Sequence, residues 1–201
     1  MVNTADGDGP MYYALSYEAF NAAGCDVTQL RLFPQPSADP EERLSGCDLV
    51  WVGGGSTVNL LALWAIHGVG DAMRVAWEKG VILGGVSAGS VCWHIGGTTD
   101  SFSNSLDPVT NGLAFLPYGN GVHYDAELNR RPRMHELMLE GTLPELAYCT
   151  DNGFGILFEG VEPVEVVADD MDPDPERGAY MVRRTGSGIE EVRLSPGAIK
   201  P

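Results

Sequence analysis

Residues 81–94 read VILGGVSAGSVCWH, and this stretch decides the fold. The apolar run 81–86 predicts a strand buried on both faces, and residues 88–94 predict the helix that follows it. Between them lies Gly85-Val86-Ser87-Ala88-Gly89, a G-x-S-x-G sequence. In this context a serine sits on a sharp, strained turn at the carboxyl end of a strand, where its hydroxyl is exposed.

Ser87 has two interpretations. As a nucleophile it would attack a carbonyl, with N–H groups and the dipole of the following helix stabilising the oxyanion. As a structural residue it would cap the helix in a glycine-rich turn. Ser90 is the competing hydroxyl, but it lies one turn into the helix, where the backbone crowds it.

A second strand–turn–helix pattern occurs upstream, at Gly53-Gly54-Gly55-Ser56-Thr57. Its glycine N–H groups suit a phosphate, yet neither GxGxxG nor GxxxxGK[ST] is present. Parallel strands carry their loops on one sheet edge, so this turn can instead lie beside Ser87. A Gly54 or Gly55 N–H would then join the Ala88 N–H around an oxyanion. A turn that only caps a helix, with Ser56 or Thr57 as the cap, is the third interpretation.

Apolar runs alternate with helical patterns in the first half of the chain, which is typical of a parallel α/β sheet. We therefore predict a three-layer α/β sandwich with a mostly parallel sheet, in one domain spanning 1–201. The expected elements are helices at 12–23, 57–66 and 71–79, the last capped by Asp71, and strands at 26–33, 48–52 and 81–86.

The pattern changes after Gly96, and the end of the chain is rich in strand patterns. Small polar residues fill 96–112 and predict a loop. Residues 159–176 hold eight acids and no base, which favours a solvated edge and loop. The other expected elements are a helix at 132–140, strands at 121–124, 155–158, 164–168, 179–184 and 189–194, and a hairpin turn at 185–188.

Composition excludes several classes of protein. The chain has 28 acidic against 12 basic residues, a net charge of −16, which argues against nucleic acids and anionic membranes as partners. No apolar stretch is long enough to span a membrane, and the N-terminus does not resemble a secretory signal. Four cysteines without CxxC spacing, and histidines without i, i+4 spacing, indicate no disulfide framework, no metal and no cofactor. A reduced, cytoplasmic protein is the default expectation.

A nucleophilic serine needs a base and a group that orients it. His123, after Asn120-Gly121-Val122, is the best-placed histidine, although a lone histidine at a strand end is often structural. His67 and His94 lie near predicted helix ends, and His135 lies inside a helix. The pattern cannot choose the orienting acid from Asp100, Asp107, Asp125 and Asp151.

Three segments taken together resemble the peptidase E family: VGGGSTVNLL at 52–61, GGVSAGSVCW at 84–93 and GVHYD at 121–125. These are serine peptidases, with cyanophycinase as a relative, on a fold similar to class I glutamine amidotransferase domains. The resemblance runs from about residue 3 to the C-terminal strands. It implies that Ser87 is the nucleophile, His123 the general base, and the turn at Gly53 to Gly55 the oxyanion loop.

The resemblance leaves the third member of the triad open between two acids. Asp100 matches an aspartate that has been treated as catalytic in the dipeptidase E pattern, and Asp151 falls near an acidic position that can also serve. Asp151 is slightly preferred, because it can come from a neighbouring strand end. Family members often carry Asn after the three glycines, where this chain has Ser56.

Arg130, in Asn129-Arg130-Arg131-Pro132-Arg133, resembles the arginine with which dipeptidase E holds an N-terminal aspartate. A guanidinium pairs bidentately with a carboxylate, which fits this role. Three arginines at a helix start oppose the helix dipole, so they favour an anionic partner over a plain basic surface. Arg133 is the second candidate.

The resemblance implies hydrolysis of short peptides that begin with aspartate, by a monomer or homodimer. Two alternatives stay open: cleavage of a β-aspartyl-arginine polymer, as in cyanophycinase, and a catalytically silent amidotransferase-like binding domain. One departure is at the start of the chain. Residues 2–8 resemble the turn that follows the first family strand, but that strand is missing, so we expect an upstream extension to raise stability.

Overall fold

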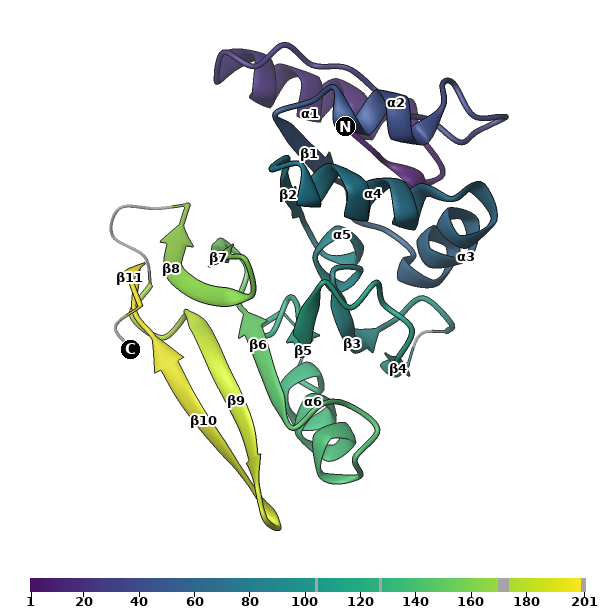
Figure 1. Ribbon diagram of the computed structural model, residues 1–201. Helices are drawn as coiled ribbons and strands as arrows, with labels where there is room; N and C mark the ends of the chain where they lie inside the picture. The colour runs from purple at the N-terminus through teal and green to yellow at the C-terminus, as the bar shows by residue number, and fades with distance from the viewer. Residues whose placement is uncertain (104, 127, 170–173, 200–201) are drawn as a thin grey trace. The chain divides into compact units, whose positions relative to one another are not determined.

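The computed structural model describes residues 1–103, 105–126, 128–169 and 174–199. The chain divides into two compact units, Met1–Cys92 and Trp93–Pro201, and the expected single domain stays a prediction. The first unit contains η1 (Thr4–Asp6), α1 (Pro10–Ala22), α2 (Pro40–Ser45), β1 (Leu49–Val52), α3 (Thr57–His67), α4 (Val69–Glu78), β2 (Ile82–Gly85) and α5 (Ala88–Val91) (Figure 1). The second unit contains β3 (His94–Thr99), β4 (Asp107–Val109), β5 (Leu116–Gly121), α6 (Arg130–Leu139), β6 (Leu146–Thr150), β7 (Phe154–Glu159), β8 (Glu162–Ala168), β9 (Ala179–Thr185), β10 (Gly188–Leu194) and β11 (Gly197–Ala198).

The sheet of the first unit is the parallel pair β1–β2, which confirms both predicted strands. Val50 and Val52 are buried at the centre of this unit. On the other face Ile82 lies opposite Leu49, and Ile82 is 62% exposed. The prediction that β2 is buried on both faces is therefore wrong. In this unit, Phe20 of α1 covers Trp51 edge-on and leaves Ile82 open to solvent.

The strand predicted at 26–33 does not form. This segment runs beside the first residue instead: the Met1 ammonium donates to the Thr28 carbonyl (2.7 Å), and the Leu30 N–H donates to the Met1 carbonyl (2.9 Å). Val2 makes a single parallel bridge to Val52. A strand needs a ladder partner along its length, and the hydrogen bonds to Met1 involve only Thr28 and Leu30 of the segment 26–33.

The helices of the first unit begin and end largely where the sequence predicts. The Ser56 hydroxyl accepts a hydrogen bond from the Asn59 N–H (3.2 Å) and caps α3, and Gly68 ends that helix in the left-handed conformation. Two predictions are wrong. Asp71 lies in the first turn of α4, whose N-cap is Gly68, and α5 ends at Val91 rather than at residue 94 because the chain enters β3.

The second unit holds a six-stranded mixed sheet in the order β10-β9-β6-β5-β3-β4. Its central pairs β3–β5 and β5–β6 are parallel, while β4, β9 and β10 run antiparallel at the two sides. A smaller antiparallel sheet, β11-β8-β7, follows. Together with β1–β2, the parallel pairs confirm the α/β class with a mostly parallel sheet and a β-rich C-terminal segment.

The predicted loop at 96–112 is wrong in part, because this segment contains most of β3 and all of β4. The glycines of this segment suggested a loop, but they allow β3 and β4 to approach each other closely. A Cβ at Gly96 would lie 2.0 Å from the Val109 carbonyl oxygen. The strand predicted at 121–124 is also shifted, since β5 spans Leu116–Gly121 and His123 follows it in a turn. The sequence pattern did not predict β6.

The core of the second unit forms where α6 packs on the sheet. Met134, Leu137 and Met138 of α6 are buried against Ala147 and Val182. The helix predicted at 132–140, the four C-terminal strands and the hairpin between β9 and β10 are confirmed.

The acidic run is partly described. Glu162 and Glu165 are exposed on β8, as expected of a solvated edge, while residues 170–173 lie outside the described residues.

Three further findings bear on function. Within the described residues, no helix is both long and apolar enough to cross a bilayer. The same residues hold no group of three or more His, Cys, Asp or Glu side chains that would suit a metal ion. Cys25, Cys47, Cys92 and Cys149 are all free thiols.

Candidate active site

The turn between β2 and α5 holds Ser87 in a strained backbone conformation, with φ 57° and ψ −117°. Such a conformation costs about 1–3 kcal/mol for a residue with a Cβ, and it persists only where the surroundings enforce it. Here close packing enforces it. A Cβ at Gly85 would lie 2.2 Å from the Gly89 carbonyl oxygen, and one at Gly89 would lie 2.2 Å from the Val52 carbonyl oxygen. Both glycines are required for strand and helix to approach this closely.

The Ser87 hydroxyl does not cap its helix. Ser87 occupies the N-cap position of α5, yet its side chain makes no capping hydrogen bond, whereas Ser56 caps α3 in the equivalent position. Ser87 is partly exposed. The geometry therefore excludes the interpretation of Ser87 as a helix cap. It leaves the hydroxyl available to act as a nucleophile.

The turn at Gly53 to Gly55 lies next to Ser87 within the same unit. A Cβ at Gly54 would lie 3.2 Å from Ser87 Cβ and 3.4 Å from the Val86 carbonyl oxygen. Gly55 has φ 131°, and a Cβ there would lie 2.3 Å from the Ala5 carbonyl oxygen, which accepts the Ser56 N–H (2.9 Å). The N-terminal residues thus hold the glycine turn against the serine turn.

These two turns present several backbone N–H groups near Ser87. The Gly89 N–H donates to the Val86 carbonyl (3.0 Å), whereas the Ala88 and Gly55 N–H groups have no acceptor among the described residues. The Gly54 N–H makes a long hydrogen bond to the Tyr12 hydroxyl (3.4 Å). Tyr12 therefore lies over the glycine turn, on the first helix. Sequence reasoning missed it, because nothing in the helical pattern of α1 marks it.

Asn3 is a second residue that the sequence did not single out. It is fully buried, and both side-chain polar atoms lack a partner within the described residues. A Cβ at Gly53 would lie 2.6 Å from Asn3 Oδ1, so this amide packs directly behind the glycine turn. Its only signal in the sequence is its position in the segment 2–8 that resembles a family turn.

His123 lies in the second unit, in the turn after β5, with a left-handed φ of 51°. Its Nδ1 is 2.5 Å from Asn152 Oδ1, and the Asn152 backbone N–H donates to Asp125 (2.9 Å). Asp125 is held in turn by the Arg177 guanidinium at 2.8 Å. The imidazole is thus oriented by Asn152, which sequence reasoning missed because it concentrated on acids.

Asp151 is buried, and its side-chain hydrogen bonds come from residues other than His123. Its Oδ2 accepts the Gly178 N–H (2.8 Å) and the Tyr180 hydroxyl (3.0 Å), while Oδ1 has no partner among the described residues. Burial raises the pKa of this carboxyl, and the two hydrogen bonds oppose that shift only in part. These contacts are those of a residue that joins β6 to β9.

Asp100 and Arg130 meet each other in the second unit. Arg130 Nη2 donates to Asp100 Oδ2 at 3.4 Å, and the Arg130 side chain is 6% exposed against 59% for Asp100. The alternative arginine, Arg133, is bound to the Leu106 carbonyl (3.1 Å) and to Glu136 (2.5 Å). Asp107 accepts hydrogen bonds from two nearby serines.

The remaining histidines take structural positions. His67 ends α3, as predicted. His94 is buried in β3 and packs edge-on against Phe158, which corrects its predicted place near a helix end. His135 of α6 contacts Glu191 at 3.1 Å.

The structure brings together two groups of predicted site residues. Ser87, Ala88, Gly54 and Gly55 lie together in the first unit. In the second unit Arg130 pairs with Asp100, and His123 pairs with Asn152 rather than with either predicted acid. The pairing of Ser87 with His123 joins residues of different units and stays a prediction.

The chain belongs to peptidase family S51, whose profile it matches over residues 2–164. It is 39% identical over 193 residues to the "Uncharacterized peptidase YgaJ" of Bacillus subtilis (strain 168), a match that covers 95% of this chain and 80% of that protein. The resemblance to peptidase E is thereby confirmed, and the family identifies a peptidase hydrolase.

Solved structures support the same fold at low identity. A peptidase from an acI-B1 Actinobacterium has a TM-score of 0.67 at 14% identity, covering 98% of this chain and 80% of that one. A protein named as a candidate peptidase E from Listeria monocytogenes EGD-e has a TM-score of 0.57 at 16% identity, covering 96% and 84%.

Proposed function

We propose that this protein is a serine peptidase that removes an N-terminal aspartate from short peptides. One observation carries the proposal: Ser87 is forced into a strained turn by two glycines that nothing larger can replace, and its hydroxyl caps nothing. Backbone strain of this kind clusters at functional sites, and a serine turn between a strand and a helix presents the nucleophile in α/β-hydrolases.

In this mechanism the Ser87 hydroxyl attacks the peptide carbonyl while His123 takes its proton. Asn152 Oδ1 can only accept, so the proton on the bonded ring resides on His123 Nδ1 and Nε2 is left as the base. An asparagine plays the same orienting part in papain-like proteases. His123 then returns the proton to the leaving amine, and water completes hydrolysis of the acyl-enzyme by the same steps.

The backbone N–H groups of Ala88, Gly54 and Gly55 would stabilise the tetrahedral oxyanion. Each donor of this kind contributes on the order of 3 kcal/mol to the transition state. Ala88 and Gly55 are available, whereas Gly54 must first release the Tyr12 hydroxyl, and its 3.4 Å hydrogen bond is long enough to break at small cost.

Arg130 would select substrates by binding the aspartate side chain of the first residue. Its guanidinium is almost fully buried and already holds a carboxylate, the exposed Asp100. A substrate carboxylate can take the place of Asp100, and the buried guanidinium then still has a counter-charge. That Asp151 or Asp100 completes the triad remains a prediction. Because the contacts of both acids are made with other residues, they favour Asn152 as the residue that orients His123.

The test is hydrolysis of a dipeptide panel with Asp, Glu or a neutral first residue, by the wild type and by Ser87→Ala. We expect the wild type to prefer Asp and the variant to lose at least about 10³-fold in kcat. Ser90→Ala is the matched control, since it removes a hydroxyl one helical turn away. Full activity of Ser87→Ala would exclude the serine mechanism.

Cleavage of a β-aspartyl-arginine polymer is the second candidate, favoured by the net charge of −16, which attracts the guanidinium groups that such a polymer displays. Comparing turnover of this polymer with that of aspartyl dipeptides separates the two functions. No turnover of either, with the fold intact, would point to a catalytically silent binding domain.

A further inference from the structure

The three tyrosines of α1 differ in what their hydroxyl groups contact. The hydroxyls of Tyr13 and Tyr17 donate to acceptors in neighbouring segments of the first unit, and they tie the helix to these segments. The Tyr12 hydroxyl instead accepts the Gly54 N–H at 3.4 Å, and its own proton has no acceptor within the described residues. The first unit therefore contains a hydroxyl donor that the fold does not use, and it lies on the glycine turn next to Ser87.

Close packing places the Tyr12 ring against this turn. A Cβ at Gly53 would lie 3.0 Å from Tyr12 Cε1, so the ring occupies space that only a glycine leaves open. A Cβ at Gly54 would lie 3.2 Å from Ser87 Cβ and 3.7 Å from the Tyr12 hydroxyl oxygen. The phenol and the candidate nucleophile therefore border the same small space.

The distance between the Gly54 nitrogen and the Tyr12 hydroxyl oxygen suits two donors that share one acceptor. At 3.4 Å it is long for a hydrogen bond. An oxyanion about 2.9 Å from the nitrogen and about 2.7 Å from the hydroxyl oxygen can nevertheless contact both without displacing either. When the oxyanion takes the Gly54 N–H, the hydroxyl can rotate its proton toward the same oxygen.

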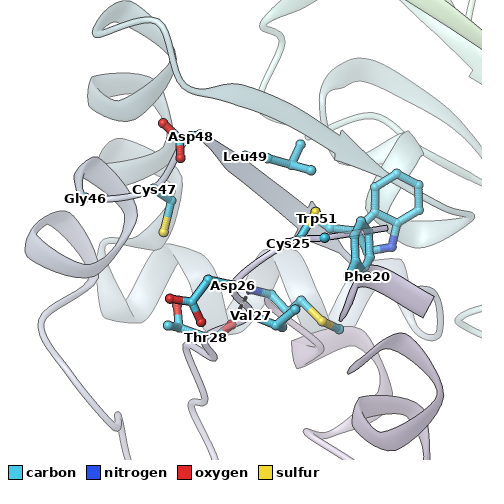
Figure 2. Close-up of a pocket in the computed structure, with 12 residues that line it drawn as sticks. Phe20, Cys25, Asp26, Val27, Thr28, Gly46, Cys47, Asp48, Leu49 and Trp51 are labelled. Atoms are coloured by element: carbon cyan, nitrogen blue, oxygen red, sulfur yellow. Dashed lines mark hydrogen bonds between the residues drawn. The ribbon is translucent and has the colours of Figure 1, made fainter. Parts of the chain in front are cut away.

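A groove of about 470 Å³ lies beside the phenol in the first unit. Tyr12 lines it together with Val86, the residue that precedes Ser87. Phe20 and Trp51 also line it, and their rings meet edge to face with centroids 5.6 Å apart (Figure 2). Because Tyr12 is only partly buried, a substrate bound at the serine turn has access to its hydroxyl.

We propose that Tyr12 is a catalytic residue whose hydroxyl donates to the tetrahedral oxyanion, next to the backbone N–H groups of the two turns. The phenol keeps its proton throughout, so it stabilises negative charge without acting as an acid or a base. The inference rests on the proposed serine mechanism and adds a side-chain donor to it. Because the oxyanion develops only as the reaction proceeds, the contribution of Tyr12 falls on kcat rather than on KM.

The test compares Tyr12→Phe with Tyr17→Phe, which removes a hydroxyl from the same helix. On aspartyl dipeptides we expect Tyr12→Phe to lower kcat by about 10²-fold, as the loss of one oxyanion donor does, and to change KM by less than about 2-fold. The Tm of Tyr12→Phe should equal that of the wild type, and Tyr17→Phe should keep the wild-type kcat. A raised KM with unchanged kcat, or an equal loss of kcat in Tyr17→Phe, would overturn the role of Tyr12.

Labelling with a serine-directed phosphonate separates this role from the serine mechanism on which it rests. The reagent develops a charged oxygen at the position of the oxyanion, so Tyr12→Phe should be labelled on Ser87 at least about 10-fold more slowly than the wild type. Equal labelling rates would overturn the role of Tyr12 and leave Ser87 as the nucleophile. A folded wild type that takes no label on Ser87 would overturn the serine mechanism, and the role of Tyr12 with it.

Discussion

At the scale of single residues, the glycines around Ser87 determine what the serine can do. Sequence reasoning predicted the turn, because G-x-S-x-G between an apolar strand and a helix has a clear steric meaning. It could not distinguish a nucleophile from a cap. That distinction depends on the direction of one hydroxyl, which three-dimensional packing decides: Ser56 turns inward to its helix and Ser87 does not.

We predict that Gly89→Ala destabilises the protein by about 1–3 kcal/mol, because its Cβ would lie 2.2 Å from the Val52 carbonyl oxygen and would push α5 from β1. Gly46→Ala is the control, since a Cβ there meets nothing closer than 3.6 Å. Urea unfolding measures both. Similar stability of the two variants would mean that the strand–helix contact is looser than described.

His123 and Asn152 provide the second prediction at this scale. Asn152→Ala removes the partner of Nδ1, so the imidazole loses its orientation and kcat should fall by about 10²-fold or more. Asp151→Asn should change kcat by less than about 5-fold, because the amide oxygen can still accept from Gly178 and Tyr180. The opposite ranking in steady-state kinetics would restore Asp151 as the orienting acid.

Asp100 provides the third prediction at the scale of single residues. If it only occupies Arg130 between substrates, Asp100→Asn should lower KM for aspartyl peptides and leave kcat nearly unchanged, since the guanidinium then has no competing charge. Peptides with a neutral first residue are the control and should show no change in KM. A collapse of kcat for both substrates would instead place Asp100 in the triad.

At the scale of secondary-structure elements, prediction succeeded where local signals decide and failed where pairing decides. The capping serine of α3 and the alternating strands of the C-terminal hairpin carry their own signals. The segment 26–33 has an equally good alternation but lacks a ladder partner, and β3 forms through glycines that suggested a loop. Partners distant in sequence set both outcomes.

The contact between α6 and β10 depends on Glu191, which accepts from Tyr124 (2.9 Å) and contacts His135 and Arg131 at 3.1 and 3.4 Å. Burial raises the pKa of Glu191, but these hydrogen bonds and charges outweigh burial, and the net pKa is lowered. A lowered pKa in the folded state adds stability above the pKa of the unfolded chain, and this stability is lost as pH falls through the folded value.

We therefore predict that Glu191→Gln lowers stability by about 1–2 kcal/mol at neutral pH and that the difference shrinks below about pH 4. Glu190→Gln, at the neighbouring position on β10, is the control. Thermal unfolding across pH measures both variants. A difference that stays constant or grows in acid would contradict the assignment of this stability to the Glu191 carboxylate.

At the scale of the whole molecule, the ordered motifs identified the family, and the α/β class followed from alternating patterns. The motifs also predicted the pairing of Ser87 with His123, and this pairing stays a prediction because it joins residues of two units. Family membership identifies a peptidase, while the proposed aspartyl substrate rests on the pairing of Arg130 with the Asp100 carboxylate, which a substrate carboxylate would replace.

The measurement that tests the account most directly is covalent labelling with a serine-directed phosphonate, read by intact-protein and peptide mass spectrometry. We predict one adduct, on Ser87, that is absent from Ser87→Ala, retained in Ser90→Ala, and slowed in Asn152→Ala, because activation of the hydroxyl requires an oriented His123. A folded protein that takes no label, or takes it at another serine, would contradict the claim that Ser87 is an activated nucleophile.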